Sequence, residues 1–163
     1  MRILPPHRDR ALIVSTDGAA RGNPGPAGIG VAVEDLAGRV VGELGEGIGV
    51  ATNNVAEYRA ALRGLELAKD LGAKSVLLRS DSRLLIEQLA GRFRVKNPTL
   101  IQLHQQVRRL LPSFESVSFE HIPRELNRRA DRLANQGVDE WLAGPGASYS
   151  RPGPAPNLFD EPE

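Results

Sequence analysis

Residues 11–18 read Ala-Leu-Ile-Val-Ser-Thr-Asp-Gly, a short apolar and β-branched run that ends in a carboxylate and a glycine. This pattern predicts a buried strand that finishes in a turn. It returns at residues 75–81, Ser-Val-Leu-Leu-Arg-Ser-Asp, so Asp17 and Asp81 each follow a buried strand. If the two strands are parallel, both carboxylates reach one edge of the sheet, where α/β sheets bind ligands. The alternative is that each aspartate closes a turn or caps the next helix.

The segments around these two strands predict an α/β fold, with a mixed sheet flanked by helices. Residues 29–34 and 39–49 are expected to form two strands of an antiparallel meander, preceded by a loop rich in glycine and proline at residues 18–28. The further elements are helices at residues 53–71, 82–90, 98–111 and 127–142 and a strand at residues 117–122. The last two strands should join the sheet through right-handed crossovers.

We expect three parts along the chain: an N-terminal lead at residues 1–10, one globular domain at residues 11–143, and a disordered tail at residues 144–163 that is rich in proline and glycine. Hydrophobic residues make up 40% of the chain, and no apolar run is long enough for a membrane span. The first residues carry no secretory pattern. These observations predict a cytoplasmic protein, and we expect it to be a monomer.

Two further acids lie on helix faces that are otherwise small and apolar. At helical spacing Glu57 shares a face with Ala61 and Gly64, and Asp131 shares one with Ala134. A structural ion pair would explain one buried acid. Two inward acids beside two aspartates at strand ends favour a shared cation instead. The chain has no cysteine, so a hard, oxygen-bound ion such as Mg²⁺ or Mn²⁺ is expected. A pair of such ions hydrolyses phosphodiesters, which points to a nuclease.

Charge is distributed unevenly along the sequence. The chain carries a net charge of +1, but residues 92–132 alone carry +5. This basic part either binds a polyanion or forms a solvated helix face.

Four blocks of the sequence carry the most specific pattern. They are Thr-Asp-Gly-Ala-Ala-Arg-Gly-Asn-Pro-Gly-Pro-Ala-Gly at 16–28, Thr-Asn-Asn-Val-Ala-Glu-Tyr at 52–58, Ser-Asp-Ser at 80–82, and Pro-Arg-Glu-Leu-Asn-Arg-Arg-Ala-Asp-Arg-Leu-Ala at 123–134. Together, and in this order, they resemble the type 1 ribonuclease H family. The resemblance extends over residues 12–138.

The resemblance implies a ribonuclease H-like fold, with a five-stranded mixed sheet flanked by helices. It implies an endonuclease that hydrolyses the RNA strand of RNA/DNA hybrids and leaves 5′-phosphate and 3′-hydroxyl ends. Two Mg²⁺ ions, or Mn²⁺ in their place, would be held by Asp17, Glu57, Asp81 and Asp131. Substrate contacts are implied for Asn23, Thr52, Asn53 and Asn54, with helix capping as the alternative for one of the last two. Amides and hydroxyls can recognise the 2′-hydroxyls of RNA.

Two other functions remain open at this stage. One is a non-catalytic module that binds hybrids, and the other is a DNA nuclease or resolvase of the same fold. The four acids argue against the first, and the Asn and Thr residues argue against the second.

The chain departs from longer family members between Ala90 and Pro98, where there is no room for an extra basic protrusion. The candidate replacements for its substrate contacts are Arg92, Arg94 and Lys96. Trp141, the only tryptophan, is expected in the core. In the tail, residues 157–160, Asn-Leu-Phe-Asp, are either inert or a contact for another replication protein.

An auxiliary catalytic group is expected shortly before Asp131. Many family members place a histidine there on a glycine-containing loop, and His121 stands ten residues before Asp131. However, His121 continues the alternation of an apolar strand face, and no glycine follows it. Some compact members have an arginine seven residues before the last acid, which is Arg124 here. We predict that Arg124 holds the scissile phosphate, with His121 or a surface ion pair of Arg124 as the alternatives.

Overall fold

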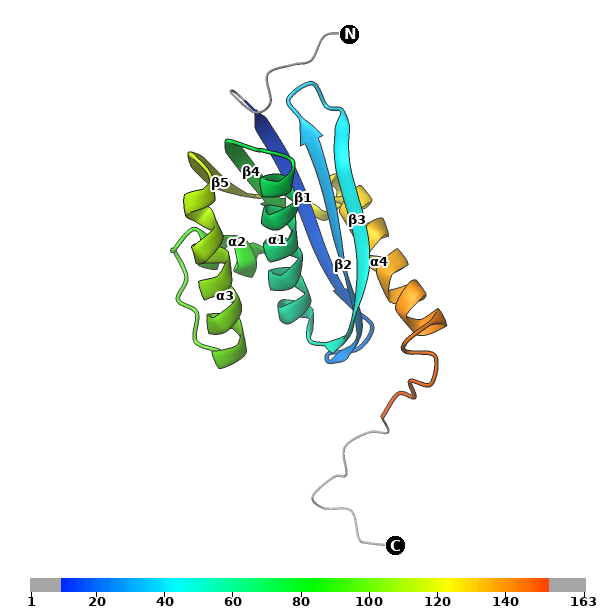
Figure 1. Ribbon diagram of the computed structural model, residues 1–163. Coiled ribbons are helices and arrows are strands. Elements are labelled where there is room, and N and C mark those ends of the chain that lie inside the picture. Colours follow the sequence, from blue (N-terminus) through cyan, green and yellow to red (C-terminus); the bar gives the residue numbers. More distant parts are fainter. Residues whose placement is uncertain (1–9, 153–163) are drawn as a thin grey trace, which may run out of the picture.

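Five strands form one sheet, in the order β3-β2-β1-β4-β5 (Figure 1). The computed structural model describes residues 10–152. β1 (Ala11–Ala20), β2 (Gly25–Asp35) and β3 (Val40–Ala51) form the antiparallel meander. β4 (Ser75–Ser80) is parallel to β1, and β5 (Ser116–His121) is parallel to β4. The predicted five-stranded mixed sheet is confirmed.

Helices cover both faces of this sheet. α1 (Asn53–Asp70), α2 (Arg83–Leu89) and α3 (Pro98–Leu110) lie on one side, and α4 (Arg128–Ala143) packs on the other side, across β2 and β3 (Figure 1). Two short 3-10 turns, η1 (Leu111–Ser113) and η2 (Arg124–Leu126), flank β5. The main core lies between the sheet and α1, where Val14, Val31 and Leu78 meet Tyr58 and Leu65. The four helices, β4 and β5 begin and end within one residue of their predicted bounds.

Glycines bring α4 into direct contact with the strands beneath it. A Cβ at Gly30 would overlap the carbonyl oxygen of Ala130, and one at Gly28 would overlap that of Ala134. Glycine is therefore needed in these strands for a close approach of backbones. The predicted loop at residues 18–28 was wrong for this reason. β1 continues to Ala20 and β2 begins at Gly25, which leaves only a short turn between them.

The residues after α4 continue as turns that pack on the helix. Gly146 lies against the indole of Trp141, and the ring centroids of Trp141 and Tyr149 are 6.1 Å apart. Trp141 is half-buried between these residues and Gly47 of β3, outside the main core, so its predicted place in the core was wrong. Residues 1–9 and 153–163, including the hydrophobic island at 157–160, lie outside the described residues. The limits of the globular domain and of the tail stay predictions.

Within residues 10–152, no helix has both the length and the apolar character needed to cross a bilayer.

Candidate active site

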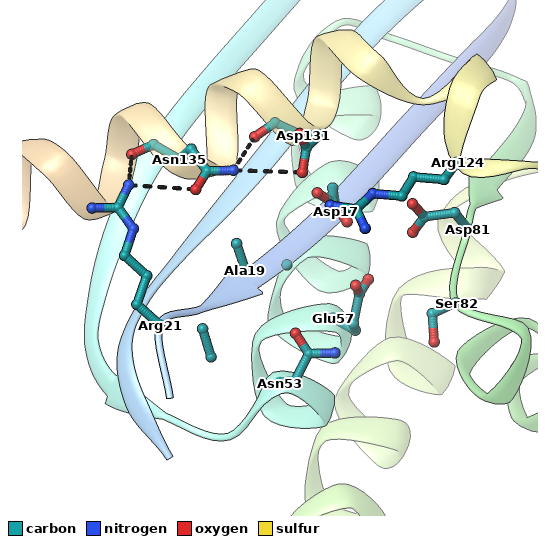
Figure 2. A pocket seen from close by; sticks show the side chains of 12 residues that line it. Asp17, Ala19, Arg21, Asn53, Glu57, Asp81, Ser82, Arg124, Asp131 and Asn135 are labelled. Carbon is teal, nitrogen blue, oxygen red and sulfur yellow. Dashed lines mark hydrogen bonds between the residues drawn. The ribbon is translucent and has the colours of Figure 1, made fainter. Parts of the chain in front are cut away.

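A cleft of about 490 Å³ opens beside the end of β1 and is lined by all four of the predicted acids (Figure 2). Asp17, Glu57 and Asp81 form its centre. One carboxylate oxygen from each lies within 4.8 Å of the corresponding oxygens of the other two. Three residues that are far apart in the sequence are therefore close enough to share one ion.

The fold explains why these three acids meet. β1 and β4 are parallel, and Thr16 pairs with Ser80, so the next residues lie side by side: Asp17 within β1, and Asp81 just after the end of β4. Glu57 comes from α1, whose first turns lie directly on β1. A Cβ at Gly18 would overlap the backbone of α1 at Glu57, so only glycine lets the helix approach this closely.

Asp131 reaches the same cleft from the first turn of α4. It is half-buried and lies outside the tight group of three. Its side chain and backbone oxygens accept hydrogen bonds from Asn135, one turn further along the helix (Figure 2). The structure thus brings the four acids to one cleft, three of them in close contact.

Burial and mutual repulsion dominate the electrostatics of the cleft. Burial raises the pKa of the Asp17 carboxyl above neutrality, and the carboxylates of Glu57 and Asp81 raise it further. Burial is also the largest cause that raises the pKa of Glu57, followed by the charge of Asp81. The sequence predicted repulsion among these acids, and the structure adds burial as the larger cause.

One oxygen of this group lacks any partner within the described residues. Glu57 Oε2 is buried and accepts no hydrogen bond. An unsatisfied carboxylate oxygen in such a place is costly unless a cation compensates it. Because all the nearby ligand atoms are carboxylate oxygens, the site fits a hard divalent cation such as Mg²⁺ or Mn²⁺.

The residues predicted to grip the substrate surround the start of α1. Thr52 is the N-cap, and its hydroxyl accepts a hydrogen bond from the backbone N–H of Val55 at 3.2 Å. The predicted cap at Asn53 or Asn54 was therefore wrong. The side chain of Asn23 accepts a hydrogen bond from the backbone N–H of Asn53 at 3.0 Å. Asn53 lines the cleft, whereas Thr52 and Asn54 are exposed beyond it.

Arg124, in η2, lines the cleft with an exposed side chain. Figure 2 shows its side chain extending into the same cleft as Asp17 and Asp81. His121 ends β5 and is exposed, with Nε2 3.2 Å from the backbone oxygen of Asp81. The expectation that His121 faces an apolar layer was wrong, because it is the last residue of an edge strand. Both candidates for the auxiliary group thus lie near the acids.

The three basic residues after α2 differ in their surroundings. Arg92 forms two hydrogen bonds with the carboxylate of Glu87, at 2.6 and 2.9 Å. Because its guanidinium is already paired with Glu87, Arg92 is a poorer candidate for a substrate contact than Arg94 or Lys96. Arg94 and Lys96 are exposed.

The sequence reasoning missed three polar residues that line the cleft, Arg21, Ser82 and Asn135. A signal was available for Asn135, because residues four apart on a helix share a face and Asn135 follows Asp131 at that distance. No comparable signal pointed to Arg21, which lies in the turn after β1 and reaches α4 only in the folded chain.

Comparisons with known proteins agree with this architecture. Residues 15–137 match the family model described as reverse transcriptase-like. The chain is 42% identical to ribonuclease HI of Halobacterium salinarum over 138 residues, which cover 85% of this chain and 69% of that protein. It is 44% identical over 129 residues to a bifunctional protein of Mycobacterium tuberculosis, covering 78% of this chain. It spans only 35% of the length of that mycobacterial protein.

Solved structures give the same relationship. The crystal structure of RNase H1 from Halobacterium salinarum has a TM-score of 0.78 at 43% identity, covering 80% of this chain and 98% of that chain. LC11-RNase H1, isolated from compost and crystallised in complex with RNA/DNA hybrid, has a TM-score of 0.77 at 43% identity. That similarity covers 80% of this chain and 99% of the other. The chain belongs to the type 1 ribonuclease H family.

Proposed function

We propose that this protein is an endoribonuclease that hydrolyses the RNA strand of RNA/DNA hybrids and leaves 5′-phosphate and 3′-hydroxyl ends. The observation that carries the proposal is the group of Asp17, Glu57 and Asp81 in an open cleft, with one buried carboxylate oxygen left without a partner. Crowded, buried carboxylates repel one another, and a divalent cation bound between them would neutralise this repulsion. A cleft open to solvent admits a long substrate.

Asp17, Glu57, Asp81 and Asp131 are the residues that would hold two Mg²⁺ ions, with Mn²⁺ as the alternative. Ions of this kind supply activation of water and stabilisation of the leaving oxygen of a phosphodiester. The four side chains contribute negative charge at fixed positions. Asp17 lies on β1, which is paired with β2 and β4, and Asp131 depends on the docking of α4.

Arg124 is proposed to hold the scissile phosphate. A guanidinium binds phosphate oxygens through paired N–H donors, and it stays protonated, so it cannot act as a base. Its place beside Asp17 and Asp81 supports this role (Figure 2). His121 is the alternative auxiliary group, because its ring contacts the backbone of Asp81.

Selection of RNA would come from the start of α1. The side chain of Asn53 lines the cleft and can donate to or accept from a 2′-hydroxyl. Asn23 and Thr52 hydrogen-bond to the backbone at this end of the helix and so hold Asn53 in place. The relative LC11-RNase H1, crystallised with RNA/DNA hybrid, supports the same class of substrate here. We further propose that the protein acts as a monomer.

One assay tests this function against its alternatives. A labelled RNA/DNA duplex, the matching DNA duplex and the matching RNA duplex are incubated with the protein and Mg²⁺, or with EDTA instead. The expected result is cleavage of the RNA strand in the hybrid that requires the metal. Binding of an intact hybrid would support a non-catalytic module, and cleavage of the DNA duplex would support a DNA nuclease. Either result would overturn the proposal.

A further inference from the structure

We infer that Arg21 and Asn135 are positioning residues, which orient the Asp131 carboxylate for metal binding. This inference rests on the proposed function only in taking Asp131 as a metal ligand. Arg21 lies in the turn after β1, and Asn135 lies one turn after Asp131 on α4. Both line the cleft that contains the acids.

A continuous chain of contacts runs along α4 and ends at Asp131 (Figure 2). The amide nitrogen of Asn135 donates to the backbone oxygen of Asp131 at 3.0 Å and to its Oδ1 at 3.4 Å. The guanidinium of Arg21 donates to the backbone oxygen of Asn135 at 3.3 Å and to its Oδ1 at 3.4 Å. At its other nitrogen, Arg21 forms an ion pair of 2.8 Å with Asp139.

The contact from Arg21 helps to fix which way the amide of Asn135 points. An amide side chain has a donor end and an acceptor end of nearly the same shape, and its neighbours select the orientation. Arg21 is only a donor, so it selects the orientation in which the oxygen of Asn135 faces it. The NH₂ group of Asn135 then faces Asp131. The backbone oxygen and Oδ1 of Asp131 are both acceptors and favour the same orientation, so the contact from Arg21 reinforces it.

Asp131 has more need of such support than the other three acids. Asp17, Glu57 and Asp81 lie within 4.8 Å of one another and are held by strand ends and by the packing of α1. Asp131 is half-buried and outside that group. A hydrogen bond to Oδ1 limits rotation of its carboxylate and leaves Oδ2 available to an ion. Partners of metal ligands commonly act in this way.

Direct contact with substrate is the competing role for Arg21, because it is an exposed cation in a cleft. The geometry favours positioning. Nη1 of Arg21 is paired with Asp139, and Nη2 donates hydrogen bonds to Asn135, so both terminal nitrogens of the guanidinium are engaged by α4. A phosphate would have to compete with these contacts.

The test measures metal binding without nucleic acid. Mn²⁺ is titrated into the full-length protein by calorimetry, for the wild type, Asn135→Ala, Arg21→Ala and the double variant. Arg129→Ala is the matched control, because Arg129 also lies on α4 in an exposed ion pair, with Glu43 at 3.3 Å. Melting temperature in EDTA, and kcat and KM for a hybrid, are measured on the same samples.

Asn135→Ala is expected to weaken Mn²⁺ binding about tenfold, the lower end of the effect of losing a partner of a metal ligand. Its melting temperature in EDTA should stay within about 2 °C of wild type, as for most surface substitutions. Arg21→Ala should weaken binding less, and in the Asn135→Ala background it should add nothing, because it acts through Asn135. Arg129→Ala should bind Mn²⁺ like the wild type.

Three results would overturn the inference: wild-type Mn²⁺ affinity in Asn135→Ala, full additivity in the double variant, or an effect of Arg21→Ala on KM alone. The last would assign Arg21 to substrate. If the wild type cut no hybrid but the Mn²⁺ pattern appeared as expected, the proposed function would fail while the positioning role stood. If hybrids were cut and Asn135→Ala bound Mn²⁺ normally, the reverse would hold.

Discussion

Replacing Asp17 by asparagine should abolish hybrid cleavage and at the same time make the metal-free protein more stable. Asp17 is 5% exposed, and its carboxyl has a raised pKa because of burial, with the charges of Glu57 and Asp81 adding to the effect. Asparagine keeps the shape of the side chain but carries no charge. The variant therefore removes a proposed metal ligand and an unfavourable charge together.

The size of the stabilisation follows from the two protonation states. In the unfolded chain the carboxyl has its ordinary pKa of 3.8, so it is ionised at pH 7. Keeping it protonated in the folded protein at pH 7 costs up to about 4 kcal/mol, at about 1.4 kcal/mol per pH unit. We expect about half of this limit, about 2 kcal/mol, because water in the open cleft screens the charges. At about 3 °C per kcal/mol, the melting temperature should rise by about 6 °C.

The sign of the pH dependence follows from the same shift. A carboxyl whose pKa is raised on folding binds more protons in the folded state, so stability falls as pH rises from about 4 towards the folded-state pKa. The wild type in EDTA should therefore melt at a lower temperature at pH 8 than at pH 5.5, and Asp17→Asn should reduce this difference. Mg²⁺ or Mn²⁺ should raise the melting temperature of the wild type more than that of the variant.

Thermal unfolding followed by circular dichroism, in EDTA and with each metal, measures these effects. Asp35→Asn is a control of opposite sign, because hydrogen bonds from Arg39 lower the pKa of Asp35. That variant should lose stability at neutral pH. A folded Asp17→Asn protein whose melting temperature in EDTA at pH 7 is equal to or below that of the wild type would refute the reasoning.

Other substitutions test the remaining parts of the site and fold. Arg124→Ala should lower kcat by about 100-fold, as expected for a positioned catalytic side chain. His121→Ala should change kcat less and stability by under about 0.5 kcal/mol, since the ring is exposed; an inactive, folded His121→Ala beside an active Arg124→Ala would reverse the assignment. Gly30→Ala should cost about 2 kcal/mol in urea unfolding, because the new methyl group overlaps the backbone of α4, and an unchanged midpoint would contradict that packing. Truncation after Ala143 should leave hybrid cleavage intact but lower the melting temperature, because it uncovers Trp141; loss of cleavage in the folded product would show that the tail takes part in the chemistry.

The sequence was most informative where a charged residue stood at a position that the hydrophobic pattern assigns to a buried face. Glu57 and Asp131 were recognised because each places a carboxylate on a small, apolar helix face. Asp17 and Asp81 were recognised because apolar runs in the sequence end at them, although β1 itself continues to Ala20. The parallel pairing of β1 and β4 then brings the strand-end acids together, as that reasoning required.

The wrong predictions have a common origin in contacts between distant parts of the chain. Gly28 looks like a loop residue in the sequence, but it lies in β2. This strand position is occupied by glycine because α4 packs directly against its backbone. His121 continues an apolar alternation, but it is exposed as the last residue of the edge strand β5. The contact between Arg21 and Asn135 joins residues 114 positions apart, so no local pattern indicates it.

Because α4 packs closely on glycines of β2 and β3, its docking during folding determines when all four acids are brought together. Asp131 is the last of the four acids to be synthesised, and its helix follows all five strands in the chain. Asp17, Glu57 and Asp81 are held by β1, α1 and β4, which contact one another directly without α4. The site gains the fourth acid only when α4 docks on β2 and β3. Completion of the proposed metal site should therefore require the same folding step that forms the contacts between α4 and the sheet.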